Sequence, residues 1–179
     1  MVNFRIAIIE KINYKTIFWF IGLMAIASIL PQFIHNQFIT GPIINATLFL
    51  AAFYLETGAA VLVGIVPSVA ALSSGLLPAL LAPMVPFIMI ANAILILTFN
   101  KLKSIHFGSG AIAASMVKYL FLYLSANLII NTLMPHNLAV KAAAIMMSWP
   151  QLVTSLAGAV IAFGIIKFVS IYHGKKEYE

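Results

Sequence analysis

The amino-acid sequence predicts an all-α integral membrane protein, a bundle of six transmembrane helices with both termini on the cytoplasmic side. Composition indicates the class, because 63% of the 179 residues are hydrophobic, 8% are charged and the mean hydropathy is +1.09. A soluble domain carries about 25% charged residues and leaves much of its surface to water. The chain is too short for two membrane domains, so we expect a single membrane domain over residues 1–179.

Six apolar segments supply the predicted helices. A transmembrane helix needs about 20 apolar residues. The predicted spans are 16–34, 42–55, 58–74, 83–99, 110–133 and 150–171. The second span is short, and only Glu56 and Thr57 separate it from the third. Residues 1–15 carry apolar side chains at helical spacing between charges, which predicts an N-terminal segment on the membrane surface.

The distribution of positive charge predicts the orientation. With six spans and an inner N-terminus, the outer loops 35–41, 75–82 and 134–149 hold one basic residue, Lys141. The inner side then receives Arg5, Lys11, Lys15, Lys101, Lys103, Lys167, Lys175 and Lys176. Cytoplasmic loops carry the excess of Lys and Arg, so this arrangement is favoured. Lys118 lies inside the fifth span, and we expect its side chain to snorkel to the inner headgroups; the alternative is a buried role.

Small residues predict where the helices approach one another. The small residues lie in the third, fifth and sixth spans: Ala60, Gly64 and Ser68 at four-residue spacing, Gly110 and Ala114, and Gly158 and Ala162 with Gly164 nearby. Helices in lipid associate through such residues. We expect this pattern to serve packing within one bundle rather than docking to another protein.

The loop before the fourth span is unusual, because it is rich in proline and yet apolar. Residues 73–87 read SSGLLPALLAPMVPF, with no charged side chain. Irregular backbone at membrane depth is tolerated where it is buried in protein or lines a cavity. Two interpretations stay open: a plain interfacial turn, or an apolar lid over a cavity between the helices.

Polar side chains gather in the outer half of the last two spans. The fifth span has a tyrosine or asparagine at every fourth position: Tyr119, Tyr123, Asn127 and Asn131. The sixth span has a polar face formed by Gln151, Thr154, Ser155 and Gly158. Amides, hydroxyls and aromatic rings suit a neutral or mildly anionic organic molecule. The alternative is that they bond to one another between helices. On the first interpretation, Asn127→Leu should abolish binding.

The residues that are absent exclude several classes of function. The chain has no cysteine and no phosphate-binding loop, and the outer half of the predicted bundle has no acidic residue. It offers no nucleophile with a base and no metal cluster, so we expect no catalysis, cofactor or metal. The basic residues are placed as in a membrane chain, so we expect the lipid bilayer, and no nucleic acid, as their partner.

Residues 41–97, GPIINATLFLAAFYLETGAAVLVGIVPSVAALSSGLLPALLAPMVPFIMIANAILIL, carry a family resemblance. With six short spans, the chain resembles the substrate-binding S components of bacterial energy-coupling factor (ECF) transporters, of the small type with unassigned substrate. The resemblance implies vitamin or micronutrient uptake and a site near the outer surface, formed by the loop after span one and by spans four to six. The implied substrate-binding residues are His35, Asn36, Asn92, Tyr123, Asn127, Asn131, Gln151 and Ser155.

The same resemblance implies partners and a location. Such proteins lie in the cytoplasmic membrane and dock, chiefly through span one, on a membrane T component coupled to two cytoplasmic ATPase subunits. Their usual Ala-xxx-Ala signature is missing here, since span one offers Gly22, Ala25, Ala27 and Ser28. The competing hypothesis is a membrane scaffold or assembly subunit that transports nothing, in which the polar stripes join helices.

Overall fold

The computed structural model describes residues 14–75, 77, 79–133 and 145–176, and within these ranges it is helical without strands. The described elements are α2 (Tyr14–Phe33), α3 (Gln37–Tyr54), α4 (Thr57–Ser73), the 3₁₀ helix η1 (Ala79–Met84), α5 (Val85–Leu102), α6 (Phe107–Leu133) and α8 (Trp149–Lys176). The predicted all-α class is confirmed. Most of the predicted surface segment 1–15 lies outside the described residues.

Each of the six predicted spans overlaps one α-helix of the structure. Five of these helices are long and apolar enough to cross a membrane, whereas Thr57–Ser73 is shorter, with 17 residues. The weakly marked boundary between the second and third spans is confirmed, because α3 ends at Tyr54 and α4 begins at Thr57. The sequence therefore located the helices well.

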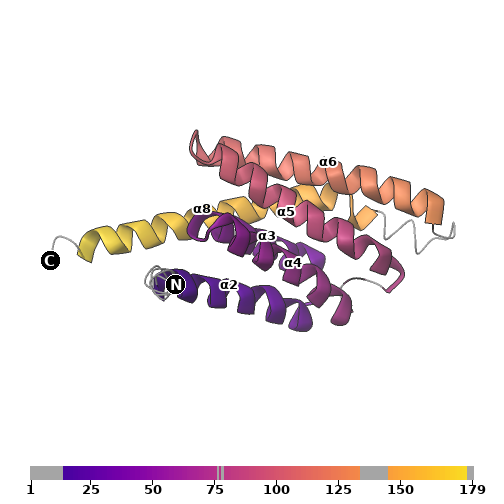
Figure 1. Cartoon of the computed structure of the whole chain (residues 1–179), viewed down its shortest axis with the longest axis horizontal. Coiled ribbons are helices and arrows are strands. Elements are labelled where there is room, and N and C mark those ends of the chain that lie inside the picture. Colours follow the sequence, from indigo (N-terminus) through magenta and orange to yellow (C-terminus); the bar gives the residue numbers. More distant parts are fainter. Residues whose placement is uncertain (1–13, 76, 78, 134–144, 177–179) are drawn as a thin grey trace, which may run out of the picture.

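The helices run back and forth between two ends of the bundle. Helix α2 begins and α8 ends at the same end, where α5 also turns into α6 (Figure 1). We call this the basic end, because Lys15, Lys101 and Lys103 lie there. The opposite end, called the distal end, holds the turn between α2 and α3 and the passage from α4 through η1 to α5.

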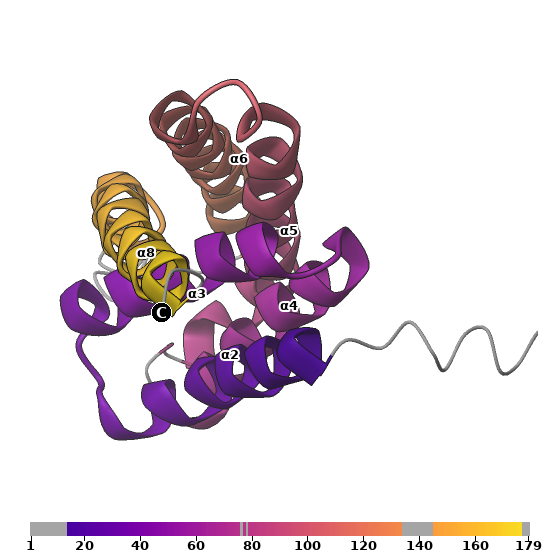
Figure 2. The ribbon, with the colours of Figure 1, turned by 90° about the vertical axis from the view of Figure 1, so that its left-hand side faces the viewer.

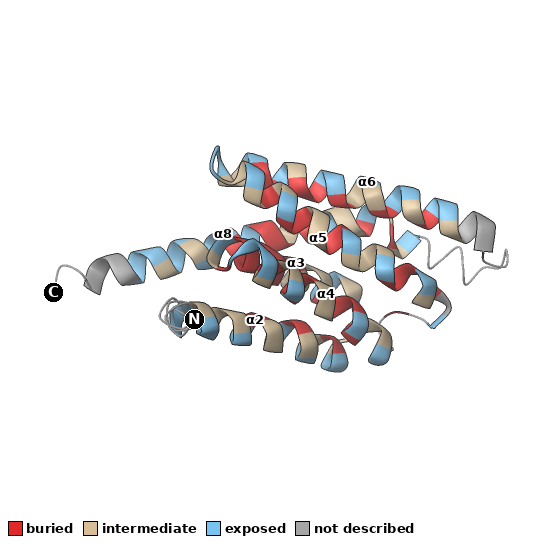
Figure 3. Cartoon of the chain, viewed as in Figure 1, coloured by how far each residue is buried: buried red, intermediate tan, exposed pale blue. Residues whose placement is uncertain are grey.

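Helix α3 occupies the centre of the bundle (Figure 2). It packs most extensively on α8 and also contacts α2, α4 and α5, so nine of its 18 residues are buried. Outward faces of the surrounding helices carry large apolar side chains, such as Phe18, Val160 and Phe168, each more than 70% exposed. Figure 3 shows buried residues toward the centre and exposed ones outside, and exposed faces that are apolar are the pattern expected of helices in lipid.

The small residues lie inside the bundle except for Gly164, which is exposed, so the predicted internal packing is confirmed for the others. Ala60, Gly64 and Ser68 are buried where α4 faces α5, and a Cβ on Gly64 would come within 2.9 Å of Ile96 Cδ1. Gly158 lies against the backbone of α3, and Ala162 is fully buried. These residues bring the helix backbones close together.

The proline-rich connection folds inward at the distal end. Gly75 takes a positive φ of 76°, which glycine adopts without steric cost, and the chain then turns back toward the bundle. Leu77, Leu81 and Met84 are buried in an apolar cluster with Ala126 and Met147. A nitrogen of the His35 ring donates to the carbonyl oxygen of Ser74 at 2.8 Å, which links this connection to the turn between α2 and α3.

Candidate functional site

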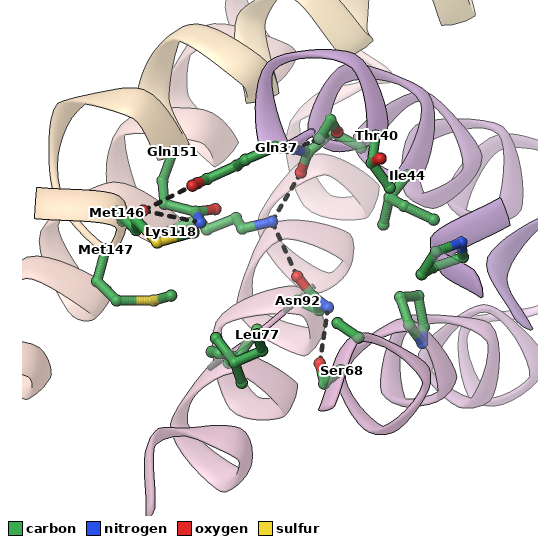
Figure 4. Close-up of a pocket in the computed structure, with 16 residues that line it drawn as sticks. Gln37, Thr40, Ile44, Ser68, Leu77, Asn92, Lys118, Met146, Met147 and Gln151 are labelled. Carbon is green, nitrogen blue, oxygen red and sulfur yellow. Dashed lines mark hydrogen bonds between the residues drawn. The ribbon is translucent and has the colours of Figure 1, made fainter. Parts of the chain in front are cut away.

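A buried lysine lies at the middle of the bundle. Lys118 is 3% exposed. It lies about 16 Å along α6 from Phe107, the first residue of that helix. Its Nζ donates to Asn45 Oδ1 at 2.7 Å and to Asn92 Oδ1 at 2.8 Å (Figure 4). The prediction that Lys118 snorkels to the headgroups is wrong, because two amide oxygens from α3 and α5 receive its ammonium inside the bundle. We call Lys118, Asn45 and Asn92 the lysine–amide centre.

The two asparagines are oriented by the backbone around them. Asn92 Nδ2 donates to the carbonyl oxygen of Gly64 at 2.8 Å and approaches Ser68 Oγ at 3.4 Å. Asn45 Nδ2 donates to the carbonyl oxygen of Gly41 at 2.9 Å. Because the amide nitrogens have these acceptors, both amide oxygens face the ammonium. The centre thereby joins α3, α4, α5 and α6.

A cavity of about 110 Å³ extends from the lysine–amide centre toward the distal end. Its polar lining is Gln37, Thr40, Asn45, Ser68, Asn92, Lys118 and Gln151. Its apolar lining includes Pro31, Ile44, Pro67, Leu77, Ile88, Met146 and Met147. Ligand pockets for drug-sized molecules measure roughly 300–1,000 Å³, so this cavity suits a smaller occupant.

Two glutamines hold the distal side of the cavity. Gln37 Nε2 and Gln151 Nε2 both donate to the carbonyl oxygen of Met146, at 2.9 and 3.2 Å. The segment just before α8 is therefore fixed to the start of α3, next to Leu77 of the proline-rich connection (Figure 4). Leu77, together with Met146 and Met147, contributes to the wall of the cavity, and irregular backbone such as that at Leu77 is tolerated at membrane depth where it lines a cavity.

Of the eight predicted site residues, Asn92 and Gln151 line this cavity. His35 and Asn36 lie in the turn before α3, where the Asn36 side chain accepts from the Phe38 amide and caps the helix. Asn131 belongs to α6, but its side chain is outside the described part of the chain. These three residues are therefore not placed among the lining residues.

Tyr123 and Asn127 of the predicted stripe on α6 do not face this cavity. Tyr123 is 43% exposed, and Asn127 is exposed and donates to the backbone oxygen of Tyr123 within its own helix at 2.8 Å. The inward face lies one residue earlier, at Lys118, Leu122 and Ala126, all buried. One amide N–H of Asn127 thus bonds within its own helix, a local bond that competes with partners across the bundle.

Ser155, the remaining predicted site residue, joins two helices instead of facing the cavity. It is fully buried, and its Oγ lies 2.8 Å from Ser115 Oγ on α6. We expect Ser155→Ala to lower the free energy of unfolding by about 1 kcal/mol, because Ser115 loses its partner. Ligand affinity should be unchanged. Thermal unfolding with and without a ligand measures both, and a large loss of affinity with unaltered stability would return Ser155 to the site.

Sequence reasoning missed Lys118 and Asn45 as members of one site. A signal was present only in part: Asn45, Asn92 and Lys118 each lie near the middle of their observed helices, but the predicted span 42–55 placed Asn45 near its end. Polar residues at one depth on neighbouring helices are expected to meet, since lipid offers them no partners.

The arrangement fits the class of helical membrane proteins, with apolar outer faces around an internal cavity that carries polar groups. No family model matches the chain, and no curated protein or solved structure matches it. The assignment of function therefore rests on the chemistry of the cavity.

Proposed function

We propose that this chain is the substrate-binding membrane subunit of an ATP-driven micronutrient importer, which captures a small organic molecule in the outward half of the bundle. One observation carries the proposal: a cavity with convergent hydrogen-bonding groups approaches the distal end, away from the lysines of the basic end. A cavity with few polar groups among apolar side chains is the usual form of a small-molecule site. Its role is binding, not catalysis.

The proposed topology has six spans with both termini in the cytoplasm of a bacterium. In the described ranges, every lysine except Lys118 lies at or toward the basic end: Lys15, Lys101, Lys103, Lys167, Lys175 and Lys176. The positive-inside rule assigns this end to the cytoplasm, so the cavity lies toward the exterior. The 17-residue α4 crosses as the short third span, held among other helices.

Partners follow from the same proposal. Capture outside and release inside need an energy source, which a membrane T component with two cytoplasmic ATPase subunits would supply. Helix α2 is the least buried of the five long helices and presents Phe18, Ile21 and Ile29 outward. This face offers an apolar surface on which a membrane partner can pack.

The competing function is a scaffold or assembly subunit that transports nothing. Two of the predicted site residues favour it. Ser155 bonds to Ser115 and so joins two helices, and Asn127 is exposed on the outside of the bundle. In that case the lysine–amide centre only joins helices, and the cavity holds water. The two functions differ in whether the purified protein retains a small molecule.

Native mass spectrometry of the gently purified chain tests the proposal. We expect a co-purifying molecule of defined mass, whose re-addition to stripped protein raises the thermal midpoint. Asn127→Leu is the matched control: its side chain lies outside the cavity, so we now expect unchanged binding, contrary to the sequence-based expectation. Absence of a bound molecule, together with no thermal shift across a panel of vitamins and small metabolites, would favour the scaffold.

A further inference from the structure

The charge inventory around Lys118 is unbalanced. The chain contains no aspartate and four glutamates, at positions 10, 56, 177 and 179. Glu56, the one acidic residue in the described ranges, is exposed in the turn between α3 and α4 at the basic end. The partners of the Lys118 ammonium are instead the neutral amide oxygens of Asn45 and Asn92.

Amide dipoles orient an ammonium but do not neutralise it. A buried ion is strongly disfavoured unless an opposite charge accompanies it, and ionisable groups inside membrane proteins pair or face a functional cavity. An ammonium has three N–H donors, and the two asparagines receive two of them. Since Lys118 also lines the cavity, its remaining donor is available to an occupant.

The walls restrict what that occupant can be. Between the lysine–amide centre and the distal end, the cavity is bounded by aliphatic and thioether side chains, including Ile44, Leu77, Ile88, Met146 and Met147. None of the described residues that line it is aromatic, so the aromatic rings that were expected at the site from the sequence are not among them. Among the described residues of the lining, Lys118 is the only basic one, which matches one negative charge rather than two.

We propose that the cavity binds a small aliphatic monocarboxylate, whose carboxylate oxygen accepts from Lys118 Nζ and whose hydrocarbon tail lies against Ile44, Leu77 and the two methionines. This inference rests on the proposed function and names the substrate class of that site. Asn45 and Asn92 hold the ammonium in place through their two hydrogen bonds to Lys118 Nζ. The ligand thereby supplies the counter-charge that is missing among the described residues around Lys118.

Matched ligands on the purified full-length protein test the class directly. Butyrate, its neutral isostere butyramide and the cation butylamine are compared by isothermal titration calorimetry and thermal shift, with sodium chloride as an inorganic anion. We expect saturable binding of butyrate, at least about 10-fold weaker binding of butyramide, and none of butylamine. Equal affinity for butyramide or for chloride would overturn the carboxylate assignment.

The tail is tested in the wild-type protein with acetate, propionate, butyrate and hexanoate. Burial of each methylene is worth about 0.8 kcal/mol, so affinity should rise about fourfold for each carbon until the cavity is filled. Ala71→Leu narrows the cavity at a part of its wall that lies away from Lys118. This variant should weaken binding of hexanoate more than binding of acetate. A flat series, with Ala71→Leu affecting all acids alike, contradicts the proposed tail site.

Lys118→Met removes the anchor, and Asn127→Leu serves as the control outside the cavity. We expect Lys118→Met to weaken butyrate at least about 30-fold, the factor that corresponds to about 2 kcal/mol for loss of one partner of a buried charge pair. Unchanged affinity in this variant overturns the proposal, and if the variant does not fold, the ligand series decides.

Failure of this inference differs from failure of the proposed function. A neutral co-purifying molecule that binds equally to Lys118→Met would contradict the carboxylate class and leave the binding-subunit function intact. Saturable butyrate binding through Lys118, without uptake by the chain together with any ATPase partner, would support the site and contradict the transport function.

Discussion

Replacing Asn92 by leucine is expected to lower the free energy of unfolding by about 2–3 kcal/mol, because it removes one hydrogen-bond partner from a buried charge. In the native chain Asn92 binds Lys118 through its oxygen and Gly64 through its nitrogen. Leucine leaves the ammonium with one amide oxygen and leaves the Gly64 carbonyl without its side-chain donor. Equilibrium unfolding in detergent micelles measures the change.

Asn100→Leu, on the same helix, is the matched control for this experiment. Asn100 Nδ2 donates to Thr57 Oγ1 at 3.2 Å, and its buried Oδ1 has no partner among the described residues. Replacing a side chain that already carries an unsatisfied acceptor should cost less than about 1 kcal/mol. If Asn92→Leu is no more destabilising than Asn100→Leu, the lysine–amide centre does not stabilise the bundle.

The double variant Asn92→Leu with Lys118→Met separates charge burial from lost packing. Methionine is uncharged and of similar length, so the double variant should recover much of the stability that Asn92→Leu alone removes. The expected coupling is on the order of 2 kcal/mol. Strict additivity of the two changes would mean that the ammonium and the amide do not interact energetically.

The positions of the helices could be predicted from the sequence because they depend on local properties. Apolar runs of membrane length are interrupted by short polar turns, as at Glu56 and from Lys103 to His106, and the structure has helices between those interruptions. Small residues such as Gly64 and Gly158 indicated internal packing for the same reason, since a close approach of two backbones requires a residue without a large side chain.

The composition of the site could be predicted only in part, because it depends on which faces of the helices meet. Tyr119, Tyr123 and Asn127 share one face of α6, but neither Tyr123 nor Asn127 lines the cavity, and Lys118 occupies the neighbouring inward face. A rotation of α6 by about 100°, which corresponds to one residue along a helix, separates the face predicted to line the site from the face with Lys118. Hydrophobicity did not show which face of α6 points into the bundle, since the face in contact with lipid is as apolar as the core.

The central position of α3 explains why Asn45 was overlooked. This helix was expected as a short second span, and its polar residues Thr40, Asn45 and Thr47 are all buried because neighbours surround it (Figure 2). Asn45 therefore has to find its partners inside the bundle, and it finds them in Lys118 and its own backbone. Knowledge of the helix order around α3 was needed before the residues at one depth could be combined into a site.

Gly158→Ala is expected to destabilise the protein by about 3 kcal/mol, at the upper end of the effect of overpacking. A Cβ at this position would lie 2.7 Å from the Ala46 nitrogen, the Asn45 Cβ and the Pro42 oxygen of α3. Two of these atoms belong to the backbone, so no side-chain rotation relieves the contact, and α8 has to move away from α3. That movement also displaces Asn45, and the variant should bind ligand more weakly.

Gly164→Ala on the same helix provides the control of opposite sign. A Cβ at Gly164 meets no atom within 4 Å, and the residue is exposed. Alanine is favoured over glycine within a helix by about 1 kcal/mol, so this variant should be as stable as the native chain or more stable. Thermal unfolding of both variants in the same detergent measures the difference. Equal midpoints would mean that α3 and α8 are not in backbone contact at Gly158, and that Asn45 is not positioned by α8.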